Sequence, residues 1–101
     1  MKISSQRYLD DDIVEVKRAA RDYLVAVSPE FEIDGVTMQV VTDGHHSLAA
    51  AKIDGVEPEF VVATVQDDDR TALLDTSIDD YLEVCYGDSD WYDIETGKDA
   101  F

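Results

Sequence analysis

The spacing of apolar residues in the first third of the chain predicts a long helix. Residues 10–27 carry apolar side chains at intervals of three and four, at Ile13, Val16, Ala20, Tyr23, Leu24 and Val27. This spacing places them on one helical face. Asp10, Asp11 and Asp12 are expected to precede or open the helix, where carboxylates suit the unpaired N–H groups and the positive end of the helix dipole. Pro29 is expected to end the helix, because the residue before a proline avoids the α conformation.

A small basic cluster accompanies this predicted helix. Lys17, Arg18 and Arg21 lie on or beside the face opposite the apolar one. Glu15 and Asp22 are close in sequence and can pair with these cations. We therefore interpret the cluster as solvated helix surface rather than as a ligand site.

The next segment changes to a period of two, which is typical of strands. Apolar and polar residues alternate over 30–42, and the Asp34-Gly35 pair in the middle predicts a hairpin. Residues 45–52 favour a helix, which Gly44 and Gly55 are expected to bound. The run 59–65 is almost entirely apolar, which predicts a strand buried on both faces, as expected for a central or parallel strand. Residues 36–65 thus predict a β-turn-α-β unit with parallel strands.

The last third predicts a second helix and a mixed tail. A solvated loop over 66–70 and a helical turn over 71–74 precede a helix at 77–86, with Ser77 as its N-cap. The tail, 87–101, is acidic and aromatic, and it either covers the core or contributes to a homodimer contact. The whole pattern predicts one α/β (α+β) domain over 1–101, with an N-terminal helix, a hairpin, the β-turn-α-β unit, a second helix and the acidic tail.

Composition places this domain in a reducing compartment. The chain has 101 residues and one cysteine, Cys85, which cannot form an internal disulfide. No apolar run reaches the roughly 18 residues needed to span a bilayer, and the first residues lack a secretory signal. We expect a cytoplasmic protein without a membrane partner. Cys85 lies on the apolar face of the second predicted helix, so we interpret it as a structural thiol.

Charge narrows the range of partners. Eight Lys and Arg oppose 24 Asp and Glu, giving a net charge of −16. Residues 53–101 contain fifteen of the acidic residues and only two basic ones, Arg70 and Lys98. Such a surface repels nucleic acid directly and favours a basic partner. Three interpretations remain open: solubility, adaptation to high salt, and imitation of the phosphates of a nucleic acid.

The segment Asp43-Gly44-His45-His46-Ser47 is the strongest candidate for chemistry. A strand that turns through a glycine into a helix presents free N–H groups, which favour a bound anion such as phosphate. The segment, followed by Leu-Ala-Ala-Ala, resembles the strand-to-helix turn of the ParB/sulfiredoxin superfamily over about residues 30–64. The resemblance implies a fold in which this helix N-terminus holds a nucleotide phosphate. Some relatives bind or hydrolyse nucleoside triphosphates, others are nucleases, and sulfiredoxins reduce an oxidised cysteine.

Two positions depart from the family pattern. The family arginine falls on Ser47, whose hydroxyl lacks the charge that clamps phosphate. The sulfiredoxin cysteine falls on His45, which excludes that chemistry. We expect no resident cofactor and no metal site, because neighbouring helical histidines point in different directions. A Mg-nucleotide complex at the turn is the exception that the resemblance leaves open.

These observations lead to two hypotheses. The first is a non-catalytic interaction protein, from a phage or mobile element, that binds a basic nucleic-acid-binding protein or complex as a DNA mimic of the anti-CRISPR or anti-restriction type. Its candidate contacts are Asp67, Asp68, Asp69, Asp79, Asp80, Glu83, Asp88 and Asp90. The alternative is a Mg-dependent nucleotide-binding or phosphoryl-cleaving protein. Its phosphate would lie at Gly44, His45, His46 and Ser47, with His45, His46 and Asp43 as catalytic candidates.

Overall fold

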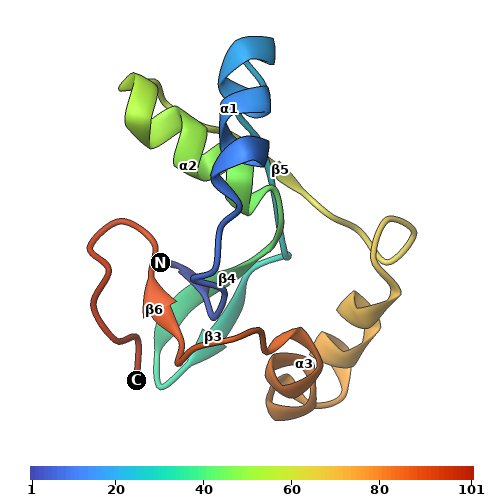
Figure 1. The fold of residues 1–101 in the computed structure, drawn as a ribbon. Coiled ribbons are helices and arrows are strands. Elements are labelled where there is room, and N and C mark those ends of the chain that lie inside the picture. The colour runs from blue at the N-terminus through green and yellow to red at the C-terminus, as the bar shows by residue number, and fades with distance from the viewer.

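A six-stranded mixed sheet organises the fold in the computed structural model, which describes residues 1–101 (Figure 1). Its strands are β1 (Lys2–Ser4), β2 (Leu24–Val27), β3 (Phe31–Ile33), β4 (Val36–Asp43), β5 (Glu59–Val62) and β6 (Tyr92–Asp93). The helices are α1 (Asp11–Ala20), α2 (His45–Asp54), the 3-10 helix η1 (Asp69–Asp75) and α3 (Ile78–Cys85). None of these helices is both long and apolar enough to cross a membrane.

The strands follow the order β5-β2-β4-β1-β6, and β3 also pairs with β4. β4 runs parallel to β1 and antiparallel to β2 and β3, while β2 and β5 are parallel. β6 adds antiparallel to β1. The tail therefore completes one side of the sheet, and its Ile94 is buried in the core.

The core is divided into two small clusters, and β4 contributes to both. Met38 and Val40 lie in the cluster that contains Tyr81 of α3, whereas Val41 lies in the cluster that contains Leu48 of α2. Successive side chains of a strand point to opposite faces, so α3 and α2 pack on different faces of β4. Phe31 and Tyr81 meet edge to face, with ring centroids 6.1 Å apart.

Several local predictions are confirmed. Asp34 and Gly35 form the turn between β3 and β4, both with positive φ (51° and 80°), as a two-residue hairpin requires. α2 follows Gly44 and ends at Gly55. Ser77 caps α3 by accepting the Asp80 N–H at 3.2 Å. Asp10 caps α1 in the same way, through the N–H groups of its first turn.

The predicted helix over residues 10–27 is wrong in its second half. α1 ends at Ala20, where Arg21 adopts a left-handed conformation (φ 51°) and its N–H bonds to the carbonyl groups of the last turn. Residues 24–27 form β2 instead. The run Tyr-Leu-Val-Ala-Val fits a strand as well as a helix. Burial of Val25 and Val27 in the sheet favours the strand.

The buried face of α1 also differs from the prediction. Ile13 and Val16 are exposed, and Val14 is the buried residue of this helix. Arg18, expected to face solvent, is half-buried and reaches α2, where its Nε lies 2.8 Å from Asp54 Oδ1. α1 therefore packs against α2, with Val14 as its buried residue and the Arg18–Asp54 ion pair joining the two helices.

The strand predicted to be buried on both faces is an edge strand, although it is parallel to its neighbour β2. β5 pairs with β2 alone, and all four of its residues are exposed. β2 lies between β4 and β5, so the two strands of the 36–65 unit are neither adjacent nor parallel. A strand with apolar residues on both faces can be a buried strand or an unprotected edge strand, and its sequence does not distinguish the two. Strand order decides between them.

Candidate functional site

Close packing against β2 explains the glycine in the strand-to-helix turn. Gly44 has φ 93°, and a Cβ there would lie 2.6 Å from the carbonyl oxygen of Leu24 and 2.9 Å from Cα of Val25. α2 begins without a side-chain cap and without an acidic residue in its first turn. Asp43 accepts the Gly44 N–H through Oδ1 at 2.8 Å. The turn therefore has the strand-glycine-helix geometry expected for it, and β2 already fills one side of it.

Both histidines are engaged within the domain. Nε2 of His45 lies 2.7 Å from the hydroxyl oxygen of Ser4, a buried residue. Burial lowers the pKa of His45, outweighing the opposing effect of the Asp43 charge. Nε2 of His46 accepts the backbone N–H of Asp10, the N-cap of α1, at 3.1 Å. His46 thus ties the first turn of α2 to the start of α1.

Ser47 faces inward. It is 1% exposed, and its hydroxyl helps to lower the pKa of Asp22, for which the ion pair with Lys17 is the main cause. Position 47, where the family arginine would fall, does not open onto solvent. The four candidate phosphate ligands are therefore adjacent in the chain but do not all face one open site.

A polar cavity of about 200 Å³ lies behind His45. It is bounded by the end of β1, by β4 and by the end of α3, with Thr42, Arg70 and Cys85 among its lining residues. Burial raises the pKa of the Cys85 thiol, so the side chain is protonated at neutral pH. Cys85 is half-buried and packs against the cluster that contains Tyr81, and its structural role stays a prediction.

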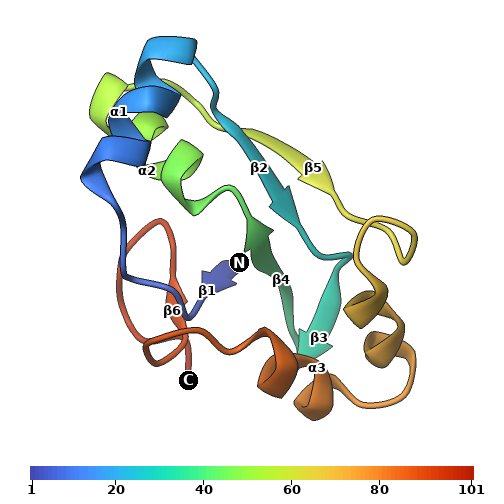
Figure 2. The ribbon, with the colours of Figure 1, turned by 45° about the vertical axis from the view of Figure 1, so that its right-hand side comes forward.

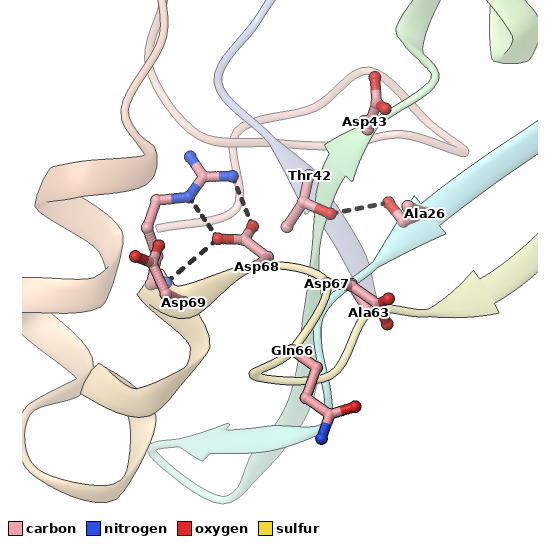
Figure 3. A pocket seen from close by; sticks show the side chains of 9 residues that line it. Ala26, Thr42, Asp43, Ala63, Gln66, Asp67, Asp68 and Asp69 are labelled. Atoms are coloured by element: carbon pink, nitrogen blue, oxygen red, sulfur yellow. Dashed lines mark hydrogen bonds and ion pairs between the residues drawn. The ribbon is translucent and has the colours of Figure 1, made fainter.

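A larger acidic cavity of about 590 Å³ opens beside the first (Figure 3). Asp43 at the end of β4 and the three aspartates at 67–69 line it, together with Thr42, whose hydroxyl donates to the carbonyl oxygen of Ala26. Sequence reasoning assigned Asp43 to the histidine turn and residues 67–69 to a separate loop. The fold brings both groups to one cavity. No three of the protein's His, Cys, Asp or Glu side chains are arranged as metal ligands.

Arg70 links the two cavities, and sequence reasoning gave it no role. Its Nε and Nη2 bind Asp68 at 2.9 and 2.6 Å, a two-point ion pair (Figure 3). This pair lowers the pKa of Asp68. The sequence signal for this ion pair was the spacing of Asp68 and Arg70, because an Asp two residues before an Arg can pair with it. The cation is thus largely neutralised by its own loop.

The eight candidate partner contacts divide into two groups. Asp68 binds Arg70, Asp67 accepts the N–H and hydroxyl of Thr64, and Asp88 accepts the N–H groups of Arg7 and Tyr8 at 2.7 and 3.0 Å. These three carboxylates hold the fold. The remaining candidates are exposed and make no side-chain hydrogen bond or ion pair: Asp69, Asp79, Asp80, Glu83 and Asp90.

Four of these five exposed carboxylates lie on η1 and α3, whose only basic residue is the paired Arg70, and Asp90 follows α3 in the chain. α3 lies at the opposite end of the molecule from α1 and α2, which carry Lys17, Arg18, Arg21 and Lys52 (Figures 1 and 2). Asp79 and Asp80 lie four and three residues before Glu83, so both neighbour it on the solvent face of α3. The chain thus separates its charges in space as well as in sequence.

No family model, curated protein or solved structure matches this chain.

Proposed function

We propose that this protein is a non-catalytic interaction protein that binds a basic, nucleic-acid-binding partner through the surface of η1 and α3. One observation carries the proposal. Residues 64–90 contain nine acidic residues and a single basic one, Arg70, which is paired with Asp68. The surface therefore presents negative charge that the domain itself does not neutralise.

The balance of ion pairs across the molecule supports this reading. Only four of the 24 acidic residues lie in an ion pair: Glu15, Asp22, Asp54 and Asp68. Three of these four pairs involve α1. A concentrated field of one sign steers an oppositely charged partner and makes binding sensitive to salt. A surface that binds nucleic acid through Lys and Arg is the partner with the matching charge.

The scaffold in this proposal is a divergent ParB-like domain of a phage or mobile element. Its support is the Gly44 turn between β4 and α2, followed by the Leu-Ala-Ala-Ala segment. Internal hydrogen bonds of His45 and His46 and burial of Ser47 favour a turn that now holds the fold. The mimicry proposal does not depend on this ancestry.

A charge-neutralising variant and a matched control test the proposal. The variant Asp79→Asn/Asp80→Asn/Glu83→Gln removes three charges from α3. The control Asp11→Asn/Asp12→Asn/Glu95→Gln removes three charges from exposed positions on α1 and the tail, away from η1 and α3. Each protein is tagged and used to capture proteins from a lysate of the source organism, followed by salt elution and identification by mass.

The expected result is a stoichiometric basic protein that the wild type and the control variant capture, that the α3 variant loses, and that duplex DNA displaces. Equal loss in both variants would show that net charge alone acts, without a defined surface. A captured protein that duplex DNA does not displace would refute mimicry. Capture of no basic protein would refute the proposed function.

A second candidate is binding of a phosphate group in the cavity behind His45. The observation in its favour is that Arg70 lines this cavity together with His45, so a bound phosphate would share the Arg70 guanidinium with Asp68. The volume of about 200 Å³ is below the range of roughly 300–1,000 Å³ usual for whole small-molecule ligands, so a terminal phosphate is the fitting group. Thermal melts with Mg-ATP, Mg-CTP and inorganic phosphate test it. A rise in melting temperature that is lost in Arg70→Gln supports phosphate binding. An unchanged melting temperature with all three ligands excludes phosphate binding.

A further inference from the structure

The outer edge of β5 is an unpaired strand. Glu59 donates to the carbonyl of Tyr23 at 2.9 Å, and Ala63 donates to that of Val27 at 2.8 Å. In a parallel pair, alternate residues bond the neighbouring strand, so positions 59, 61 and 63 face β2. The N–H and C=O groups of Phe60 and Val62 therefore point away from the sheet. β5 ends the strand order, and no other segment lies along its outer side (Figure 2).

The side chains of β5 leave this edge unprotected. Phe60, Val61 and Val62 are 36%, 40% and 53% exposed, and they alternate between the two faces of the strand. Lys2 covers one face of the Phe60 ring, with Nζ 4.6 Å from its centroid, which leaves the two valines as the open apolar surface. Natural edges are usually blocked by lysine, proline or a bulge within the strand. Residues 60–62 contain none of these.

Both ends of the edge are acidic. Glu57 and Glu59 lie at its start, and the aspartates 67–69 follow its end. A strand with apolar residues in the middle and Lys or Arg at both ends matches this arrangement. A second copy of this chain does not, because antiparallel pairing of β5 with itself would place residues 67–69 of each copy near Glu57 of the other.

From this edge we infer that the basic partner docks an extended segment beside β5, in a strand-addition mode that rests on the proposed function. The segment donates to the outward C=O groups of Phe60 and Val62 and accepts from their N–H groups. Its apolar side chains contact Val61 and Val62, and its terminal cations lie near Glu57 and Asp69, whose carboxylates make no internal hydrogen bond or ion pair. Main-chain bonds supply the affinity and the acidic ends select the partner.

A synthetic peptide provides the test. The probe is fluorescein-labelled Lys-Lys-Val-Thr-Val-Thr-Val-Lys-Lys, and its control is the same peptide with alternate amides N-methylated, which keeps charge and side chains but removes the donors. Binding is measured by anisotropy, and protection of the Phe60 and Val62 N–H groups by hydrogen exchange. We expect the probe to bind at least about tenfold more tightly than the methylated peptide and to protect both N–H groups.

Variants of β5 locate the contact. Val62→Pro removes an outward N–H that β2 does not use, and it should weaken the probe by about tenfold or more. Val62→Thr keeps that N–H and should change affinity by less than about threefold. Melting curves show whether each variant remains folded. The exchange measurement on the wild type tests the same contact without any substitution.

Three outcomes would overturn the inference. Equal binding of the two peptides would show that charge alone attracts the segment. Protection absent from Phe60 and Val62 would place the contact elsewhere. A dimer of the free protein that dissociates on Val62→Pro would make a second copy the occupant. Capture of a DNA-displaceable basic protein alongside any of these results would leave the proposed function standing, so the two failures are distinguishable.

Discussion

Replacing Gly44 by alanine measures how closely β2 packs against the strand-to-helix turn. The new Cβ would lie 2.6 Å from the Leu24 carbonyl oxygen, a backbone atom that cannot rotate away. The substitution adds two costs. A non-glycine residue in the left-handed region costs about 1–2 kcal/mol, and forced overpacking costs about 1–3 kcal/mol more. We expect a loss of about 2–5 kcal/mol, a large part of the ~5–15 kcal/mol stability of a small domain.

Gly55→Ala is the matched control at the other end of α2. Gly55 also has positive φ (67°), but a Cβ there meets nothing within 4 Å. It should incur only the conformational cost of about 1–2 kcal/mol. The effect of alanine on the unfolded chain is the same in both variants and cancels in the difference.

Urea unfolding followed by circular dichroism gives both free energies of unfolding. The difference between the variants should be about 1–3 kcal/mol with unchanged m-values. Equal destabilisation by the two substitutions would refute the argument, because it would mean that β2 does not contact the turn. Gly44 would then be explained by the turn's conformation alone.

Three further substitutions test individual groups. Burial lowers the pKa of His45 below its ordinary 6.5, so the unfolded chain binds the proton first as pH falls. Wild type should therefore lose stability relative to His45→Gln below pH 6.5, and parallel stability curves would contradict this. Asp88→Ala should destabilise the fold, because the Asp88 carboxylate accepts two backbone N–H groups, which also lower its pKa. The stability that Asp88 contributes should be lost as the pH falls through this lowered pKa. A melting temperature that the substitution leaves unchanged at pH 7 would exclude such a contribution. Tyr81→Phe should stay within about 1 kcal/mol of wild type, because the buried Tyr81 hydroxyl has no hydrogen-bond partner; a larger loss in urea unfolding would indicate a bond to that hydroxyl.

Features that depend on a few neighbouring residues were predictable from the sequence. Asp10 and Ser77 cap their helices, Asp34-Gly35 forms the hairpin turn, and Gly44 and Gly55 bound α2. Each is a hydrogen bond or a backbone conformation that forms within one turn of chain. The charge asymmetry along the chain was also predictable, because it follows from counting the charged residues in the sequence.

Features that depend on strand order and helix rotation were decided by tertiary structure. The apolar runs at 23–27 and 59–65 fit more than one element or environment, and pairing with β4 and β2 determined what they became. Burial of Val14 rather than Ile13 followed from the contact of α1 with α2. The meeting of Arg70 with His45 joins residues 25 positions apart through the packing of η1 beside β4. Sequence periodicity states which residues share a face, but only the assembled sheet determines what that face contacts.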